Sequence, residues 1–377
     1  MLEADIAIVG SGPAGSMLSL LLAKLGIKVV MLEASVHPRR KPCGEALNPG
    51  AMQLLQRVGL GLMDGISCRS EPIHGWRLHY GKTILEAQYP NRTAGVACPR
   101  SLLDDWLVRE AVKAGARIEE GARVKGLLYD NGKIGGVYGR TITGSEFSAA
   151  SRFVVGADGL GSVVARAAGL NRFGKLRKAA FTVHVSGVEH LEPIIELHLQ
   201  PDLVVGLAPV GEGLANMTIG TSGSRAGLAS GRKSEFVREA IQQLPRLASR
   251  MGKISFEDDL IACGPFDRPN APAAGSGVLL VGDAAGYYDP LTGQGIYRAL
   301  RMAELAAPLL LEALCRNSEL PLYAYDRLLK QEFARGTRLQ RFIQYGTGHP
   351  LLFHSALRCI SVNQGLRSKL AAVIGDC

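Results

Sequence analysis

Aromatic residues and paired cysteines are both scarce in this sequence. Phe, Trp and Tyr make up 6% of the 377 residues, and they are not interleaved with Lys and Arg as on surfaces that bind single-stranded nucleic acid. The seven cysteines are an odd number, without a CxxC pair or a His/Cys cluster at zinc spacing. These absences disfavour a nucleic-acid partner, a disulfide framework and a structural metal site.

Long apolar runs are missing as well. None reaches the roughly 18 to 20 residues that span a bilayer, because the most apolar stretch, residues 302–314, contains Glu304, Pro308 and Glu312. We therefore expect no transmembrane segment. The first residues lack the basic and apolar regions of a signal peptide, so a cytoplasmic location is expected. The net charge of +9 favours anionic partners and leaves open a peripheral membrane contact through the basic C-terminal third.

The opening residues have the pattern of one βαβ unit. Residues 5–9 form a continuous apolar run bounded by glycine, which is typical of a buried parallel strand. Residues 13–25 are predicted to form a helix, and residues 28–32 the next strand. Glu33 ends that strand eighteen residues beyond Gly15, where a carboxylate can accept hydrogen bonds from a ribose.

The turn between the first strand and the helix has the sequence GSGPAG. Gly10 permits a tight turn, Gly12 lets the backbone approach a pyrophosphate, and Gly15 allows close packing of the helix. Pro13 and Ala14 begin the helix, whose free N–H groups and dipole stabilise a phosphate. The sequence spacing therefore matches a dinucleotide-binding unit in all five features: the first strand, the glycine turn, the helix, the second strand and the carboxylate.

A second glycine-rich segment follows a predicted buried strand at residues 277–281. Pro290 breaks the chain, and Gly293 and Gly295 leave a backbone that a flat ring could approach before a helix begins at about residue 295. The candidate binding residues of this segment are Gly282, Asp283, Pro290, Gly293, Gln294, Gly295 and Ile296. Alone, the segment is also compatible with a simple glycine loop.

Taken with the first motif, the second segment resembles that of FAD-dependent monooxygenases and geranylgeranyl-reductase-like flavoproteins, which have a p-hydroxybenzoate-hydroxylase-like fold. The resemblance implies that Asp283 binds the ribityl chain of FAD and that the loop faces the isoalloxazine ring. Residues 154–169 are similar to another segment of this family. There, Asp158 and Gly159 are expected near the FAD pyrophosphate and are linked with NAD(P)H use.

Two more segments extend the resemblance. Arg100 leads a segment similar to the family helix whose arginine reaches the cofactor, and residues 41–52 resemble the PCG loop of geranylgeranyl reductases. This loop, with Gly44, is expected to pass close to the flavin, and Arg40 to neutralise a phosphate. Cys43 is a candidate for the wall of the substrate cavity, and its alternative interpretation is a small buried apolar residue.

The order of these elements predicts an α/β fold with a discontinuous, Rossmann-like FAD-binding domain and an inserted, mostly antiparallel substrate sheet. The predicted segments are 1–70, 96–172 and 264–300 for the FAD-binding domain, 71–95 and 173–263 for the substrate sheet, and 301–377 for C-terminal helices. Further predicted strands are residues 118–120, 124–129, 134–138 and 152–155, and further helices are residues 49–58, 99–114 and 233–251, the last broken at Pro245.

The resemblance implies an FAD-dependent monooxygenase that uses NAD(P)H and O2 to hydroxylate an aromatic or similarly activated substrate, whether a small molecule, a carrier-bound group or a peptide. The absence of a second GxGxxG unit agrees with the transient use of reductant in this family. The alternative is a flavin-dependent reductase of a prenyl-type double bond, although residues 205–209 lack the aromatic YxWxFP segment of prenyl reductases. Halogenation is disfavoured because no WxWxIP segment is present, and a non-catalytic flavin-binding partner is a further interpretation.

Overall fold

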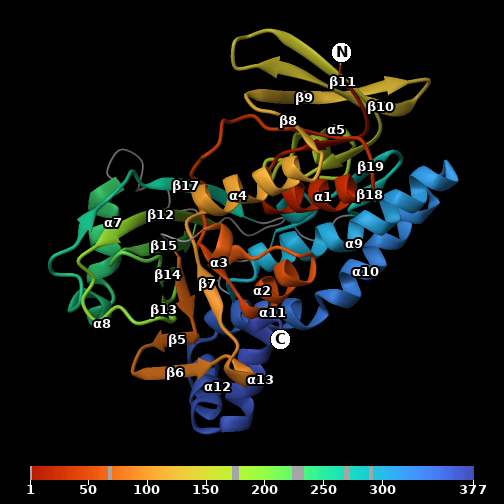
Figure 1. The fold of residues 1–377 in the computed structure, drawn as a ribbon. Coiled ribbons are helices and arrows are strands. Elements are labelled where there is room, and N and C mark those ends of the chain that lie inside the picture. Colours follow the sequence, from red (N-terminus) through yellow and green to blue (C-terminus); the bar gives the residue numbers. More distant parts are fainter. Residues whose placement is uncertain (1, 67–69, 172–177, 223–232, 267–271, 288–291) are drawn as a thin grey trace.

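The computed structural model describes residues 2–66, 70–171, 178–222, 233–266, 272–287 and 292–377. These residues form two large β-sheets, a small third sheet and helices that cover them. Figure 1 shows the first large sheet and its hairpin at one end of the molecule, the second sheet to one side, and the last C-terminal helices at the opposite end.

The first sheet has a parallel core with antiparallel additions at its edges. In the order β18-β19-β11-β1-β2-β8, the pairs β1–β2, β1–β11, β2–β8 and β11–β19 are parallel, and β9 and β10 form a hairpin that joins β11. Its strands are β1 (Leu2–Val9), β2 (Val29–Leu32), β8 (Arg117–Glu119), β9 (Ala122–Asp130), β10 (Lys133–Thr141), β11 (Glu146–Gly156), β18 (Ala274–Gly275) and β19 (Val278–Leu280). The strands predicted in this part of the chain are confirmed.

Helix α1 (Pro13–Lys24) packs against α4 (Arg100–Lys113) and α9 (Gly295–Arg316) beside this sheet (Figure 1). It begins at Pro13, because the N–H that proline lacks would be unpaired in the first turn of a helix. It ends at Lys24, shortly before Gly26, whose φ of +79° favours glycine. The predicted βαβ unit is therefore confirmed. The shorter helices nearby are α2 (Pro49–Arg57), α3 (Leu62–Gly65) and α5 (Val163–Ala167).

The second sheet is mostly antiparallel, as predicted. Its order is β16-β12-β15-β14-β13-β5-β6, with β17 beside β12, and only the pair β13–β5 is parallel among the described strands. Its strands are β5 (Gly75–Tyr80), β6 (Thr83–Gln88), β12 (Lys178–Ser186), β13 (Ile195–Gln200), β14 (Leu203–Pro209), β15 (Ala215–Ser222), β16 (Ser255–Phe256) and β17 (Ile261–Phe266). Helices α7 (Lys233–Gln242) and α8 (Pro245–Ala248) confirm the predicted break at Pro245 and bury Val237 and Leu247 against this sheet.

A small sheet, which the sequence patterns did not indicate, connects these parts. It consists of β3 (Ala46–Leu47), β7 (Gly95–Ala97) and β4 (Glu71–Ile73), so that β4 pairs with β7 and not with the large second sheet. Strands of two or three residues are too short to show a period. The sheet fixes the chain immediately after Cys43 and Gly44, which places these residues at the junction of the two large sheets.

Helices also form the C-terminal part of the chain, as predicted. They are α10 (Tyr325–Glu332), α11 (Ala334–Thr347), α12 (Pro350–Val362) and α13 (Gln364–Gly375). Helices α12 and α13 pack against β6 of the second sheet, and α11 contacts both of them. No helix of the described residues is long and apolar enough to cross a membrane.

Candidate active site

A cavity of about 1000 Å³ opens at the carboxyl ends of β1, β2 and β11 and extends to the second sheet. Ligands of open α/β sheets bind at this edge. The lining includes Gly10 after β1, Glu33 after β2 and Asp158 after β11 on one side, and Leu197 and Asn216 of the second sheet on the other. Residues predicted from separate motifs therefore converge on one space.

The three glycines of the first turn differ in what surrounds them. A Cβ at Gly10, whose φ is +97°, would lie 2.5 Å from the carbonyl oxygen of Ala157, and a Cβ at Gly15 would lie 2.0 Å from that of Gly10. Gly12 has φ of −71°, and the nearest atom to its Cβ would be Nη2 of Arg100 at 3.8 Å. Gly10 and Gly15 are thus required by the packing of the chain, and Gly12 faces open space. The cavity is lined by Gly10, Gly12, Pro13 and Ala14 but not by Gly15.

Glu33 is a buried carboxylate held by several donors. Its Oε2 accepts hydrogen bonds from the N–H and the hydroxyl of Ser11, both at 3.0 Å, and its Oε1 accepts one from the N–H of Ser35 at 3.0 Å. Burial by itself would raise the pKa of Glu33, but the charge of Arg39 and these backbone N–H groups lower it to about 2. Glu33 is therefore an ionised acceptor at the cavity wall, as a ribose site requires.

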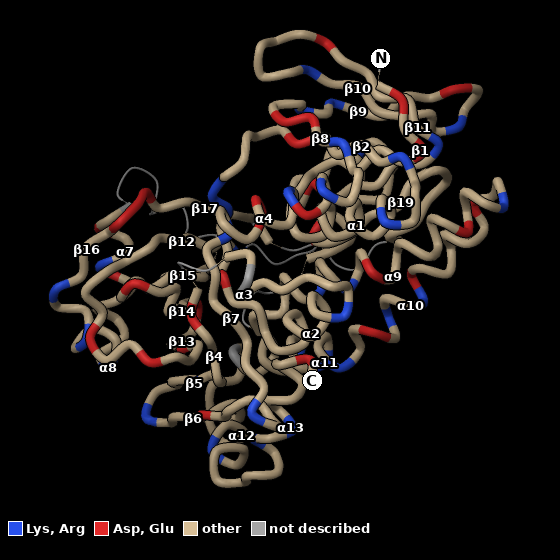
Figure 2. Tube along the Cα trace, in the orientation of Figure 1, with Lys and Arg blue, Asp and Glu red and all other residues tan. Residues whose placement is uncertain are grey.

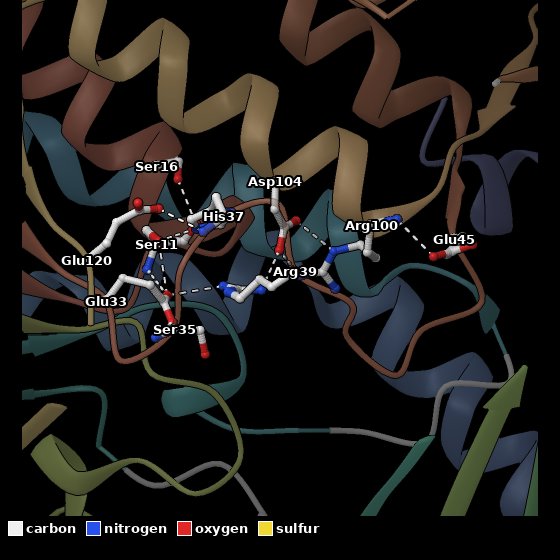
Figure 3. Close-up of polar contacts among 10 residues, drawn as sticks. All are labelled: Ser11, Ser16, Glu33, Ser35, His37, Arg39, Glu45, Arg100, Asp104 and Glu120. Carbon is white, nitrogen blue, oxygen red and sulfur yellow. Dashed lines mark hydrogen bonds and ion pairs between the residues drawn. The ribbon is translucent and has the colours of Figure 1, made fainter. Parts of the chain in front are cut away.

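An arginine pair on a shared carboxylate continues this network along the cavity (Figure 3). Arg39 contacts Glu33 at 3.1 Å and Asp104 at 2.9 Å, and Arg100 binds Asp104 through Nε at 2.7 Å and Nη2 at 2.8 Å. Asp104 is completely buried. Arg39 and Arg100 both line the cavity, so guanidinium groups face it while Glu33 and Asp104 balance their charge. Sequence reasoning identified Arg100 and missed Asp104, although its i,i+4 spacing on the predicted helix was a signal.

The structure places Arg40 differently from the expectation that it neutralises a phosphate. Its guanidinium donates to the carbonyl oxygen of Asp259 at 2.9 Å and contacts the carboxylate of Asp258 at 2.8 Å. Arg40 does not line the cavity, whereas the preceding residue, Arg39, does. The reason is that adjacent side chains of an extended loop point in different directions, so that only one of the two can face the cavity.

The loop after these arginines passes along the cavity through Cys43 and Gly44. The Sγ of Cys43 accepts a hydrogen bond from the N–H of Glu45 at 3.3 Å, and burial raises the pKa of the thiol. Cys43 is therefore a neutral thiol at the cavity wall. A Cβ at Gly44 would meet no atom within 4 Å, which leaves its backbone open to a flat ligand.

A chain of three titratable side chains begins at this loop. Glu45 lines the cavity, has a φ of +56°, and accepts a hydrogen bond from the N–H of Arg100 at 2.8 Å. Its Oε2 lies 2.6 Å from Nε2 of His184, and Nδ1 of His184 lies 2.6 Å from Oδ2 of Asp258. Burial would lower the pKa of His184, but the hydrogen bonds and charges of Glu45 and Asp258 outweigh it and raise that pKa. The imidazole of His184 thus links the carboxylate of Glu45 at the cavity wall to that of Asp258, which does not line the cavity.

Asp158 supplies an acceptor oxygen that has no hydrogen-bond partner among the described residues. Its Oδ2 accepts hydrogen bonds from the N–H of Val163 at 2.6 Å and of Val164 at 3.4 Å, while its Oδ1 is buried without a hydrogen bond. Burial raises the pKa of this carboxyl group. Gly159, with φ of +75°, has no neighbour within 4 Å of an added Cβ. A buried, unpaired oxygen beside open backbone fits a ligand that donates a hydrogen bond.

The second glycine-rich segment closes the same cavity. Gly282, Asp283, Gly293, Gln294, Gly295 and Ile296 line it, and Pro290 lies outside the described residues. Added Cβ atoms at Gly293 and Gly295 would have no neighbour within 4 Å. Gln294 is held by hydrogen bonds from its Nε2 to Val373 O at 2.8 Å and to Oδ2 of Asp376 at 2.9 Å. At the start of α9, the segment therefore presents backbone atoms to the cavity that no neighbouring side chain covers.

The wall on the side of the second sheet is mainly apolar. It includes Trp76, Ile195, Leu197, Leu207 and Ala208, while Asn216 and Thr218 are its polar members near Cys43. Gly206 stands where an aromatic segment would be expected in prenyl reductases, and Leu197 packs 3.4 Å from the position of its missing Cβ. Gly206 and Ala208 therefore present little side-chain surface to this wall.

A buried cluster elsewhere in the second sheet has the composition of a metal site. His79, Glu196 and His198 lie together on β5 and β13. However, Arg250 donates to both oxygens of Glu196, at 2.6 Å and 3.0 Å, and the rings of His79 and His198 stack in parallel with centroids 4.3 Å apart. The bidentate arginine already compensates the carboxylate, so we interpret the cluster as an ion-pair network.

The cavity fits FAD on three observations: unpaired Asp158 Oδ1, open glycine backbone at both motifs, and guanidinium N–H groups beside the helix N-terminus. Residues 3–329 match the model of the FAD binding domain family. A digeranylgeranylglycerophospholipid reductase of Methanopyrus kandleri is 30% identical over 329 residues, which are 83% of this chain and 82% of the relative. A menaquinone reductase of Mycobacterium tuberculosis is 30% identical over 362 residues, or 90% and 83%.

A solved structure agrees with these relatives. The geranylgeranyl bacteriochlorophyll reductase-like protein of Thermoplasma acidophilum superimposes with a TM-score of 0.83 at 25% identity, over 99% of this chain and 96% of that one. The expected fold and cofactor are confirmed: the chain belongs to the FAD binding domain family and is an FAD-dependent oxidoreductase.

Proposed function

We propose that this oxidoreductase saturates a prenyl-type carbon–carbon double bond, and that hydroxylation, the first expectation from the sequence, is not its reaction. Two relatives at 30% identity are named reductases, one of digeranylgeranylglycerophospholipid and one of menaquinone. Geranylgeranyl groups are isoprenoid chains with isolated double bonds. The proposal rests on one observation in this chain, the apolar wall of the cavity.

That wall suits an isoprenoid better than a polar aromatic substrate. Trp76, Ile195, Leu197 and Leu207 offer hydrocarbon surface on the side of the cavity that the second sheet forms. Burial of one CH₂ group contributes about 0.8 kcal/mol. A five-carbon prenyl unit on this wall would therefore contribute about 4 kcal/mol to binding.

Saturation of a double bond requires a hydride at one carbon and a proton at the other. When bound and reduced, FAD supplies the hydride, and NAD(P)H is the proposed source of the two electrons that reduce it again. The protein has to supply the proton. Cys43 as a neutral thiol and Glu45 both line the cavity, so either can stand beside the substrate carbon.

The hydrogen-bonded side chains of Glu45, His184 and Asp258 can supply Glu45 with a new proton after it has given one to the substrate. With both ring nitrogens protonated, His184 can give its Nε2 proton to Glu45 while its Nδ1–H stays on Asp258, whose side chain is 21% exposed. The ring is then neutral, and it is charged again when Nε2 takes up another proton. The raised pKa of His184 favours this charged form. We propose Glu45 and Cys43 as the cavity groups that deliver the proton, and His184 with Asp258 as the groups that replenish it.

The proposal is tested with the FAD-loaded protein and a digeranylgeranyl glycerophospholipid dispersed in detergent. We expect the product to gain two hydrogen atoms for each saturated bond, under anaerobic conditions with NADPH or dithionite as reductant. In air, substrate-dependent oxidation of NADPH should consume no O2. A product that gains an oxygen atom from O2, with no saturated product, would overturn the proposal and support monooxygenation.

A further inference from the structure

The C-terminal helices carry a one-sided charge. Residues 333–375 contain no Asp or Glu but six basic residues, and these contribute most of the net charge of +9. The basic residues are Arg335, Arg338, Arg341, Arg358, Arg367 and Lys369. All except Arg367 are exposed, and no ion pair within the described part of the chain involves any of them. This charge is therefore available to an external partner.

Helix α12 also exposes large aliphatic side chains. Phe353 and Leu357 are buried, at 2% and 3% exposure, on the face toward β6. Leu351 and Val362 are 86% and 79% exposed, and with Arg358 they recur at the spacing of one helix face. This face of α12 therefore combines exposed aliphatic side chains with an exposed arginine.

Exposed basic and apolar side chains also occur on α13, which follows α12, and on α11, which precedes it. Leu366 is 39% exposed and lies three residues before the exposed Lys369. On α11, Arg338, Phe342 and Tyr345 share one face by their spacing, and the two rings are 45% and 68% exposed. Figure 2 shows α12 and α13 with Lys and Arg at the end of the molecule away from the β9–β10 hairpin.

We propose that this surface docks on an anionic lipid bilayer. We define the C-terminal basic face as Leu351, Arg358 and Val362 of α12 with Leu366 and Lys369 of α13. Aliphatic side chains on one face of a helix insert at the boundary of headgroups and acyl chains, and basic residues beside them bind anionic headgroups. Isolated aliphatic groups interleaved with long basic side chains suit this boundary better than the flat, packed core of a protein interface.

The position of the surface relative to the cavity agrees with this partner. Gln340 and Gln344 of α11 and Ile374 of α13 line the cavity wall, and both helices contact α12. A bilayer bound at the C-terminal basic face would therefore lie against the helices that enclose the cavity. The docking surface goes beyond the proposed reaction, because it can be measured without any substrate.

The experiment is cosedimentation of the FAD-loaded full chain with vesicles of phosphatidylcholine, alone or mixed with phosphatidylglycerol. We expect binding to the anionic vesicles that weakens as salt is added. The variant Arg358→Glu/Lys369→Glu should lower the partition coefficient by about tenfold or more. Leu351→Ser/Val362→Ser should lower it at high salt as well, since its effect is not electrostatic.

Matched controls lie on the hairpin at the far end of the molecule. Lys125→Glu/Lys133→Glu reverses the same number of exposed charges, and Ile142→Ser removes an aliphatic side chain that is 77% exposed. Both should bind vesicles like the unmodified chain. Absence of binding to anionic vesicles, or an equal loss in the hairpin variants, would overturn the docking surface. Neither result would bear on saturation of a detergent-dispersed substrate, which is measured separately.

Discussion

Substitution of Gly12 by alanine should remove FAD and leave the protein folded. Gly12 is the N-cap of α1, with φ of −71° and ψ of −175°, a conformation that alanine adopts without strain. A Cβ there would be in ordinary contact with Nη2 of Arg100 at 3.8 Å and would otherwise project into the cavity. The methyl group would occupy the space through which a pyrophosphate approaches the N–H groups of the helix.

The size of the effect follows from the hydrogen bonds that are lost. A hydrogen bond to a charged group contributes about 1.5–3 kcal/mol, so the loss of two such bonds would weaken FAD binding by about 3–6 kcal/mol, or roughly two to four orders of magnitude. The apoprotein should gain about 0.4–1 kcal/mol of stability, because alanine restricts the unfolded chain more than glycine does. FAD affinity and apoprotein stability therefore change in opposite directions.

The measurements are fluorescence titration of the apoprotein with FAD and urea unfolding of the same apoprotein. Gly15→Ala is the matched control, because its Cβ would lie 2.0 Å from Gly10 O and should destabilise the apoprotein itself. A Gly12→Ala protein that retains FAD with unchanged affinity would refute the assignment of Gly12 to the pyrophosphate. So would a loss of FAD accompanied by an equally large loss of apoprotein stability.

Three further predictions concern the carboxylates. Glu45→Gln should retain FAD and lower turnover by about a hundredfold, and unchanged turnover would exclude Glu45 from proton delivery. Asp104→Ala leaves Arg39 and Arg100, both largely buried, without their shared partner, and urea unfolding should show a loss of about 3–5 kcal/mol. Glu33 has a lowered pKa of about 2, so its stabilising contribution is complete above its unfolded pKa of about 4.3 and is lost as the pH falls from there toward 2. The free energy of unfolding of Glu33→Gln should therefore change less with pH in that window. An unchanged pH dependence would contradict the assignment of Glu33 as an ionised, hydrogen-bonded carboxylate.

The sequence predicted those parts of the fold that short-range patterns determine. The βαβ unit is local, because strand β1, Gly10, helix α1 and strand β2 follow one another within 32 residues, and each has its own period or turn residue. The second sheet was predictable as a class, since its strands alternate. Its register and the parallel pairing of β13 with β5 bring together residues more than one hundred positions apart, and no local pattern encodes that pairing.

The candidate site was predictable where glycine or a carboxylate stands at a motif offset, and not where it is assembled from side chains of distant segments. His184 on β12 had no distinguishing spacing, since an alternating strand places a histidine toward solvent or toward a pocket equally well. Only the fold brings it within 2.6 Å of both Glu45 and Asp258. Glu45 itself adopts a left-handed conformation that is uncommon for a residue other than glycine, so its orientation could not be inferred.

The position of Arg40 outside the cavity suggests a role in positioning that can be tested against the phosphate role. Arg40 contacts Asp258, and Asp258 contacts His184, so removal of the guanidinium would leave more of the Asp258 charge acting on the imidazole and raise the pKa of His184 further. Arg40→Ala should therefore bind FAD with an affinity within about twofold of the unmodified chain, while the limb of the pH–rate profile that reports His184 moves to higher pH. Arg39→Ala is the matched comparison, because Arg39 lines the cavity and should lose FAD affinity. If Arg40→Ala instead weakened FAD binding as much as Arg39→Ala and left the pH profile in place, Arg40 would be a phosphate ligand and the chain from Glu45 to Asp258 would not depend on it.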